Sequence, residues 1–467
     1  MALFGTNGVR GIVNEELTSE LALNLTRSLM TFLFENKQNK KQEDASVRIA
    51  IGTDTRISGM MLKSAAISGA LASGASVTDV GVVPTPSLQY YVKNNPTVDA
   101  GIIITASHNP REYNGIKIIA GDGTEFSRES EKRVEDILNS EKFISADWSK
   151  TGNLQYESGC NEQYLTGIMN QIDKAAVKKR KFKVTTDTGC GAGSLTLPEL
   201  MSRLGCKVLA LGAQPDGTFP WRNPEPLPDA LKEMSELIKN PSSEKFDLGI
   251  AHDGDADRAV FIDENGDFID EEIILAAIEK YVLQTEKGPV VTTVATSRRF
   301  TDVAKDAGVP IYYTPVGSID VGRKMVEIGA VYGGEGNGGM IFAKHQICRD
   351  GAMAAAVVLE MLAKTGMKAS ELKKTVPVYF NEKTKIKLPT IDLKKKMAEI
   401  SKKIEADKKK IGYDSVETID GLKLLFKSGW ILIRPSGTEP MIRIVAEAKT
   451  KEDAEKFLKI GKQYVEN

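Results

Sequence analysis

Cysteine and histidine are both scarce in this chain. Among its 467 residues there are four cysteines and three histidines. The cysteines stand far apart, and no two of them form a C-x-x-C pair. These counts disfavour a disulfide framework and a cysteine-based zinc site, so we expect free thiols in a reducing compartment.

An excess of charge of either sign is also lacking. The 62 basic and 63 acidic residues give a formal net charge of -1. No overall basic field exists to hold nucleic acid, so any anion has to be bound by local groups. No apolar run approaches the ~18 residues of a membrane span, and no basic, apolar leader opens the chain. We expect a soluble cytoplasmic protein without a nucleic-acid or membrane partner.

What the chain does have is a regular alternation of short apolar runs with longer amphipathic ones. This alternation is typical of βαβ units and of a mainly parallel sheet. The pattern restarts twice, and after about residue 372 it changes to runs typical of antiparallel strands flanked by charged helices. A length of 467 residues fits three or four domains. We predict three consecutive α/β domains with mainly parallel mixed sheets and a smaller C-terminal α+β domain, over residues 1–155, 156–257, 258–372 and 373–467.

A serine follows one of the predicted buried strands. The apolar run Gly101–Ile104 leads into the segment Thr105–Pro110, which contains Ser107. Open α/β sheets bind ligands at the carboxyl ends of their strands, and the proline stiffens the turn. Ser107 is therefore a candidate nucleophile. Taken alone, a serine at such a place is more commonly a capping or turn residue.

Three aspartates alternate in the segment Asp253–Arg258. Asp253, Asp255 and Asp257 can converge on one cation, and ligation by oxygen alone suits Mg²⁺ better than Zn²⁺. Without a cation, three close carboxylates would repel one another. The segment also matches part of an EF-hand calcium loop, but Arg258 stands where that loop needs glycine, and the flanking runs are strand-like. We therefore predict a magnesium site and reject the EF-hand.

The segment Gly334–Gly339 matches the letters of the dinucleotide fingerprint G-x-G-x-x-G. In that fingerprint the glycines open a helix. Here the apolar run Met340–Phe342 continues as a strand instead. Glu335 and Asn337 are therefore candidates to contact sugar hydroxyls, with a plain flexible loop as the alternative.

The segment Arg434–Pro440 follows the apolar run Trp430–Ile433. It combines an arginine, two hydroxyls and a glycine with an accessible N–H, and this combination favours a phosphate cradle over a tight surface turn. Arg443 can add a second guanidinium. The residues predicted to bind phosphate here are Arg434, Ser436, Gly437, Thr438 and Arg443.

Weaker signals lie elsewhere in the chain. The glycine-rich start Phe4–Gly11 exposes Arg10, the segment Gly52–Arg56 presents another arginine, and Lys117 lies ten residues beyond Ser107. Each of these cations could belong to an ordinary surface. Together, however, a serine, a carboxylate cluster, a phosphate cradle and several cations are the groups that phosphoryl transfer requires.

These segments resemble, in the same order, the motifs of the α-D-phosphohexomutase family. Phe4–Gly11 is similar to the family's N-terminal motif, and Thr105–Pro110 to its phosphoserine loop. Asp253–Arg258 resembles its metal loop, Gly334–Gly339 its sugar loop, and Arg434–Pro440 its phosphate-binding loop. The resemblance spans nearly the whole chain, and it implies three α/β domains and a smaller C-terminal domain around a central cleft.

The resemblance also implies a mechanism. Phosphorylated Ser107 would give its phosphoryl group to a hexose 1- or 6-phosphate, and the resulting sugar 1,6-bisphosphate would return its other phosphate to Ser107. The resemblance implies that Ser107, Asp253, Asp255 and Asp257 would hold the metal, and that Arg10, Lys117 and Arg258 would surround the phosphoryl group. It also implies that Glu335 and Asn337 would contact the sugar. The residues implied to hold the other phosphate are Arg434, Ser436, Gly437 and Thr438.

One part of the sugar loop departs from the family pattern. Many members carry a serine and a closing histidine where this chain has Asn337 and Gly339, and the result is similar to a glycine-rich variant of archaeal members. The missing histidine would be a candidate acid or base. Lys117 could serve in one half-reaction, and His345 or His108 in the other.

Three functions remain open from the sequence. The leading one is a phosphohexomutase acting on glucose, mannose or glucosamine phosphate, as a monomer or homodimer. The N-terminal motif favours the phosphoglucosamine mutase branch, while the glycine-rich sugar loop also fits broad phosphomannomutase/phosphoglucomutase members. The second is a phosphatase with a phosphoserine intermediate, although hydrolysis needs no second phosphate site. The third is a non-enzymatic metal- or nucleotide-binding protein, which rests on the two partial motif matches alone.

Overall fold

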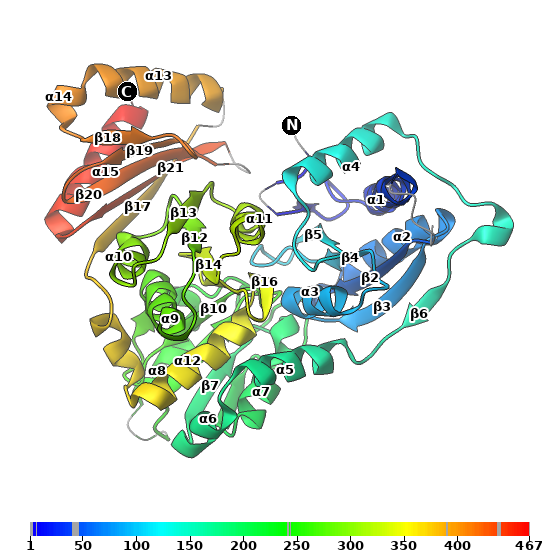
Figure 1. Ribbon diagram of the computed structural model, residues 1–467, viewed down its shortest axis with the longest axis horizontal. Coiled ribbons are helices and arrows are strands. Elements are labelled where there is room, and N and C mark those ends of the chain that lie inside the picture. The colour runs from blue at the N-terminus through cyan, green and yellow to red at the C-terminus, as the bar shows by residue number, and fades with distance from the viewer. Residues whose placement is uncertain are drawn as a thin grey trace.

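Four sheets follow one another along the chain, each with its own helices (Figure 1). The computed structural model describes residues 3–5, 7–39, 46–240, 242, 244–388, 391–436 and 440–466. The first three sheets mix parallel and antiparallel pairs, and the fourth pairs its strands antiparallel throughout. This confirms the prediction of three α/β units followed by an α+β unit. Within the described ranges, no helix is both long enough and apolar enough to cross a bilayer.

The first sheet has the strand order β1-β5-β4-β2-β3-β6. Its strands and helices are β1 (Val9–Ile12), α1 (Ser19–Asn39), β2 (Arg48–Thr53), α2 (Gly59–Ala72), β3 (Ser76–Val82), α3 (Thr85–Asn94), β4 (Ala100–Ile104), β5 (Tyr113–Ala120), α4 (Arg128–Ser140), η1 (Trp148–Lys150) and β6 (Leu154–Tyr156). In β4, Ile102 and Ile104 pack with α1 and α2, whereas Ile103 packs with α3 on the opposite face. Burial on both faces explains why β4 is a continuous apolar run.

Strand β5 was not predicted from the sequence. It lies between β1 and β4 and pairs antiparallel with both. Its Asn114 and Gly115 are typical of a turn rather than of a strand, which hides the strand in the sequence. The consequence is that Lys117, which by sequence could belong to the surface, is 2% exposed inside the sheet.

The second sheet has the order β11-β10-β9-β7-β8. Its elements are α5 (Cys160–Gln171), α6 (Lys174–Arg180), β7 (Lys183–Asp187), η2 (Ala192–Leu195), α7 (Leu197–Arg203), β8 (Lys207–Leu211), η3 (Pro228–Leu231), α8 (Lys232–Lys239), β9 (Leu248–His252), β10 (Ala259–Ile262) and β11 (Phe268–Ile269). After β9 the chain turns back as an antiparallel hairpin into β10. The boundary predicted at residue 257 therefore falls inside this sheet, because a hairpin prolongs the parallel pattern from which the boundary was inferred.

The third sheet has the order β13-β12-β14-β15-β16. Its elements are α9 (Glu271–Thr285), β12 (Val290–Thr293), α10 (Arg298–Asp306), β13 (Ile311–Thr314), α11 (Ser318–Ile328), β14 (Tyr332–Glu335), β15 (Gly339–Phe342), β16 (Gln346–Arg349), α12 (Gly351–Thr365) and η4 (Ala369–Lys374). Helix α12 is buried from Gly351 to Leu362 and joins the second and third units in one apolar core. A helix that is apolar all round has to be surrounded by protein in this way.

The fourth sheet has the order β17-β21-β20-β19-β18. Its elements are β17 (Phe380–Lys387), α13 (Leu393–Ala406), α14 (Lys408–Ile411), β18 (Ser415–Glu417), β19 (Leu422–Leu425), β20 (Gly429–Pro435), β21 (Met441–Ala448) and α15 (Lys451–Glu466). Along β20, Ile431 and Ile433 pack under α13 and α15, while Trp430 and Leu432 pack against Val294 of the third unit. This alternation seats the fourth unit on the third.

One acidic side chain in the third unit is buried without a partner. Glu279 of α9 is 0% exposed, and no described residue donates to either carboxylate oxygen. Burial raises the pKa of Glu279 well above its usual range. The native state therefore keeps this proton at pH values where the unfolded chain, with a pKa of about 4.3, has lost it. Below about pH 4.3, the unfolded-state pKa, both states hold the proton and Glu279 has its most favourable effect on stability. The stability then falls as the pH rises from there toward the raised pKa of the native state.

We expect Glu279→Met to raise the free energy of unfolding by about 1–3 kcal/mol at pH 8, because methionine has no acceptor to desolvate and no charge to bury. The gain should be smaller at pH 5. Urea unfolding at the two pH values measures the difference. The exposed Glu455→Met on α15 is the control, and equal gains at both pH values would contradict the assignment.

Candidate active site

Ser107 lies just beyond the end of β4 and is fully buried. Its φ angle is 53°, in the left-handed region that residues with a side chain seldom adopt. Its hydroxyl donates to Asp253 Oδ2 at 2.6 Å, and its N–H donates to Thr105 Oγ1 at 2.9 Å. A buried serine held in a sparsely populated conformation at a strand end is typical of a functional site rather than of a surface turn.

Arg56, directly beyond β2, holds the serine loop in this conformation. Its side chain is 0% exposed, and its Nε lies 3.1 Å from Asp54 Oδ2. The sequence did not distinguish it from a surface arginine, because its partners are backbone carbonyls from another part of the chain. The guanidinium donates to the carbonyls of Ser107 at 2.9 Å, Asn109 at 2.6 Å, Pro110 at 2.6 Å and Tyr113 at 2.8 Å.

Asp253, Asp255 and Asp257 follow β9 and are all buried. One carboxylate oxygen of each lies within 4.8 Å of the others. The second oxygens of Asp255 and Asp257 are buried, and no described residue donates a hydrogen bond to them. Carboxylate oxygens in this state, at this spacing, fit a hard divalent cation. The flanking β9 and β10 are strands, which confirms the rejection of the EF-hand.

The aspartates differ in charge. Burial and the charges of Asp257 and Asp255 raise the pKa of Asp253 to about 8. Burial opposes ionisation of Asp255 too, but the charge and hydrogen bond of Lys117, the hydrogen bond from Thr85 and the charge of Arg349 together outweigh it and hold the pKa of Asp255 below its usual range. Without a cation, Asp253 therefore holds its proton more firmly than Asp255 does, and a bound cation would displace that proton.

A second buried arginine supports the metal loop, and no signal in the sequence singled it out. Arg222 donates from Nη2 to the carbonyl of His252 at 2.6 Å and from Nε to Asp187 Oδ1 at 2.9 Å. Asp187 ends β7, next to β9 in the sheet. The serine loop and the metal loop meet at the Ser107–Asp253 hydrogen bond, and a buried arginine holds each of them. In both cases the arginine pairs with an aspartate at the end of a strand or just beyond it.

Lys117 reaches the aspartates from β5. Its Nζ lies 2.6 Å from Asp255 Oδ2 and 3.4 Å from Asp257 Oδ2. Thr85, at the start of α3, donates to the same oxygen of Asp255 at 2.6 Å. The structure therefore brings Lys117 together with the aspartate cluster.

The two predicted arginines lie beside the serine loop. Arg258 donates its N–H to Asp253 Oδ1 at 3.2 Å, and its Nε lies 3.7 Å from Asp257 Oδ1. Arg10 of β1 donates to Asn109 Oδ1 at 2.8 Å. Burial lowers the pKa of Arg10 to about 10, so it stays charged at neutral pH. Lys117 and Arg258 thus contact the aspartates, and Arg10 contacts the serine loop.

The three histidines have different surroundings. The charge of Arg258, burial and the charge of Arg10 hold the pKa of His108 far below its usual range, so it is neutral beside the serine. His345 stacks on Tyr90, with ring centroids 4.8 Å apart, and lies 3.5 Å from Asp350 Oδ2. It packs the junction between α3 and the third sheet. His252 is in β9, and burial lowers its pKa to about 4.

The segment Gly334–Gly339 is a hairpin between β14 and β15, so its glycines do not open a helix. Glu335 Oε2 accepts a hydrogen bond from Arg349 Nη1 at 3.2 Å. Asn337 Oδ1 accepts one from the N–H of Gly339 at 3.1 Å. Arg349 was not predicted. The only feature of the sequence that could have pointed to Arg349 is its position as a charged residue at the end of the strand before α12.

Arg434 of β20 pairs with an aspartate of its own unit. Its Nε lies 3.0 Å from Asp420 Oδ2. Burial lowers the pKa of Arg434, while the negative charges of Asp420 and Glu335 act to raise it. Because the charge of Glu335 acts on Arg434, the predicted phosphate loop and sugar loop lie within electrostatic range of each other.

The remaining residues of the predicted phosphate loop are only partly described. Arg443 of β21 is the register neighbour of Arg434. The N–H of Ser436 donates to the carbonyl of Met441 at 2.9 Å, which closes the loop. Gly437 and Thr438 lie outside the described residues.

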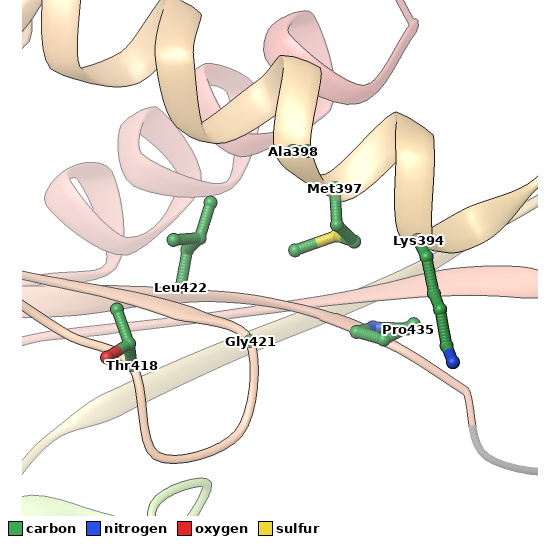
Figure 2. A pocket seen from close by; sticks show the side chains of 7 residues that line it. All are labelled: Lys394, Met397, Ala398, Thr418, Gly421, Leu422 and Pro435. Carbon is green, nitrogen blue, oxygen red and sulfur yellow. The ribbon is translucent and has the colours of Figure 1, made fainter.

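A pocket of about 370 Å³ lies close to this loop, on the fourth unit (Figure 2). Its walls are α13 on one side and the β18–β19 turn with the end of β20 on the other. None of the predicted site residues lines it. The lining residues are Lys394, Met397, Ala398, Thr418, Gly421, Leu422 and Pro435.

Four family descriptions match the chain in succession, all of them domains of phosphoglucomutase/phosphomannomutase. The alpha/beta/alpha domains I, II and III match residues 1–145, 162–266 and 270–379, and the C-terminal domain matches residues 385–459. These matches run in the same order as the four sheets.

Relatives match the chain over nearly its full length. A phosphoglucomutase/phosphomannomutase of Thermococcus kodakarensis is 45% identical over 465 residues, which cover 99% of this chain and 98% of the relative. A phosphoglucosamine/phosphogalactosamine mutase of Sulfurisphaera tokodaii is 40% identical over 470 residues, 99% of each chain. The crystal structure of a phosphoglucomutase/phosphomannomutase family protein from Burkholderia thailandensis has a TM-score of 0.85 at 25% identity and covers 100% of this chain and 97% of its own.

These relatives are mutases by name, which supports the mutase interpretation and not the phosphatase alternative. The serine, the aspartate cluster and the cations stand together in the fold, as the resemblance implied. The chain belongs to the phosphoglucomutase/phosphomannomutase family and is an α-D-phosphohexomutase, an isomerase that moves a phosphoryl group within its substrate.

Proposed function

We propose that the protein interconverts hexose 1-phosphates and hexose 6-phosphates through phosphorylated Ser107 and a hexose 1,6-bisphosphate, with Mg²⁺ at Asp253, Asp255 and Asp257. The observation that carries this proposal is the hydrogen bond of 2.6 Å from Ser107 Oγ to Asp253 Oδ2. It puts the hydroxyl that would carry the phosphoryl group against the carboxylates that fit the cation. Ser107 and Asp253 lie 146 positions apart in the sequence, so it is the fold that brings them into contact.

In the first half-reaction, the free hydroxyl oxygen of the sugar phosphate attacks the phosphorus on Ser107. A new P–O bond forms as the bond to Ser107 Oγ breaks, and the hydroxyl proton passes to a base. In the second, Ser107 Oγ attacks the phosphorus of the other phosphate, the bond from that phosphorus to the sugar oxygen breaks, and the sugar oxygen takes up the proton and leaves as a hydroxyl. Nothing is consumed over the cycle, as an isomerase requires.

The cations around the serine have a clear part in this scheme. Lys117, Arg10 and Arg258 surround the place where the charge of a transferring phosphoryl group would be. A divalent cation on the aspartates would neutralise further charge there. Neutral His108 is our proposed proton acceptor, because a phosphoserine would add negative charge beside it and raise its low pKa toward neutrality.

Substrate recognition is assigned to the third and fourth units. Glu335 and Asn337 would contact the sugar, and the loop of Arg434, Ser436, Gly437 and Thr438, with Arg443, would hold the phosphate that does not react. The two relatives are named for glucose and mannose phosphates and for glucosamine and galactosamine phosphates. We propose a substrate from these hexose phosphates.

We further propose a cytoplasmic location and a monomer or homodimer. The four cysteines are unpaired, which supports a reducing compartment. Light scattering on the purified protein measures the oligomeric state.

The test of the proposed function is a substrate panel. The protein is incubated with Mg²⁺ and a trace of glucose 1,6-bisphosphate, and the 1-phosphates of glucose, mannose and glucosamine are then offered separately. Phosphorus NMR is expected to show conversion to the 6-phosphate, and the order of rates identifies the preferred sugar. Release of inorganic phosphate alone, at a rate that matches sugar consumption, would instead establish a phosphatase.

A further inference from the structure

We propose that Arg349 is a positioning residue that occupies the space of a missing side chain at residue 339 and orients Glu335 for the sugar while it anchors the metal loop through Asp257. The inference rests on the proposed mutase function, since it assigns Glu335 to the sugar. It concerns a residue that lies outside all five motifs of the resemblance.

Arg349 fills the space in which a side chain at residue 339 would lie. A Cβ atom built on Gly339 would overlap Arg349 Cδ and lie 3.1 Å from its Cγ. The backbone of Gly339 is not in the left-handed region, so a side chain there is opposed by its neighbours, chiefly by the arginine and less closely by Asn337 Oδ1 at 3.1 Å. Gly339 and Arg349 therefore form a matched pair, in which the absence of one side chain makes room for the other.

Arg349 contacts a carboxylate in each of the two loops. Arg349 Nη1 donates to Glu335 Oε2 at 3.2 Å, and its Nη2 pairs with Asp257 Oδ2. Its planar fork thus joins the sugar loop of the third unit to the metal loop of the second. Arg349 is 5% exposed, and its Nε is buried without a hydrogen-bond partner among the described residues.

Arg349 keeps its positive charge between the two carboxylates. Although burial acts to lower it, the carboxylates of Asp257 and Glu335 raise the pKa of Arg349 above its usual value. The guanidinium therefore keeps its proton and does not act as acid or base in place of a histidine. What it supplies is a fixed orientation of one Glu335 oxygen, which leaves the other to accept a hydrogen bond from the substrate.

Two substitutions at the same contact test the proposal. Arg349→Ala removes the fork, and Gly339→Ala pushes it aside without touching its charge. We expect each to raise KM for the sugar phosphate about tenfold or more, with a smaller change in kcat, because the lost interaction is made with the bound sugar. Gly322→Ala on α11 is the matched control, since its new Cβ would meet Ile347 Cγ2 at an ordinary 3.6 Å.

The double variant gives the decisive measurement. Once Arg349 is alanine, the two arginine atoms that a Cβ at residue 339 would meet are gone and only Asn337 Oδ1, at 3.1 Å, stays close, so Gly339→Ala should add little to the effect of Arg349→Ala. The proposal would be overturned if the double variant raised KM by the product of the two single increases. It would also be overturned if KM were unchanged in both single variants. Arg349→Lys should recover only part of the loss, because an ammonium cannot bridge both carboxylates as the fork does.

A second readout does not need activity. Mn²⁺ binding to the unphosphorylated protein, followed by electron paramagnetic resonance, should become severalfold tighter in Arg349→Ala, because Asp257 loses a competing cation. Unchanged or weaker Mn²⁺ binding would overturn the inference that Arg349 occupies an oxygen of Asp257 that the metal would use. If the unaltered enzyme converts no hexose phosphate, the proposed function fails, and the Mn²⁺ measurement still decides whether Arg349 competes for Asp257.

Discussion

Replacing Ser107 with alanine is expected to lower mutase turnover by about 10⁴-fold or more, because the proposed carrier of the phosphoryl group is lost. The hydroxyl of Thr105, two residues earlier in the same loop, cannot take its place. The hydroxyl of Thr105 donates to Asp54 Oδ2 at 2.6 Å and accepts from the N–H of Ser107, so it is fully used in holding the loop. Phosphorus NMR with the preferred sugar 1-phosphate measures the loss.

The fold should tolerate this change. Alanine keeps the volume of Ser107 apart from the hydroxyl, and Asp253 can hold its own proton once the donor is gone. Ser87→Ala on α3 is the matched control, since Ser87 is equally buried and its hydroxyl donates to Asn161. Intact-mass spectrometry after incubation with glucose 1,6-bisphosphate should find a phosphoryl group on the unaltered protein and on Ser87→Ala only. Near-normal turnover of Ser107→Ala would place the carrier elsewhere.

Much of the fold was predictable because its signals are local. The strand before Ser107 is a continuous apolar run, and it is buried on both faces of its sheet. Asp253, Asp255 and Asp257 alternate in sequence and follow a strand, so their convergence needed no knowledge of the rest of the chain. The same holds for the hairpin at Gly334–Gly339, where a strand rather than a helix follows the glycines.

The residues that escaped prediction depend on distant partners. Arg349 meets Asp257 across 92 positions, and Arg222 meets Asp187 across 35. Nothing in the residues beside an arginine tells whether its partners are carbonyls, carboxylates or water. The antiparallel hairpins at the sheet edges escaped for a related reason: strand direction is set by pairing, which the apolar pattern of one strand does not record.

Arg56 is where the second large effect is expected. Arg56→Met should cost about 3–5 kcal/mol of stability, because it leaves Asp54 buried without its cation. The protein that remains folded should turn over about 10²-fold more slowly or worse, because the four carbonyls that fix the serine loop lose their donor and Ser107 shifts. Urea unfolding measures the first effect, and kcat on the folded fraction measures the second.

A double variant separates the two causes. Burial already raises the pKa of Asp54, so Asp54→Asn in the Arg56→Met background removes a group that resists ionisation there and should restore much of the stability. Activity should stay low, because the carbonyls of the serine loop are still without a donor. Recovery of activity along with stability would show that Arg56 serves only the fold. Low activity in a stable double variant would show that the loop around Ser107 has to be held by a guanidinium for the hydroxyl to meet the aspartates.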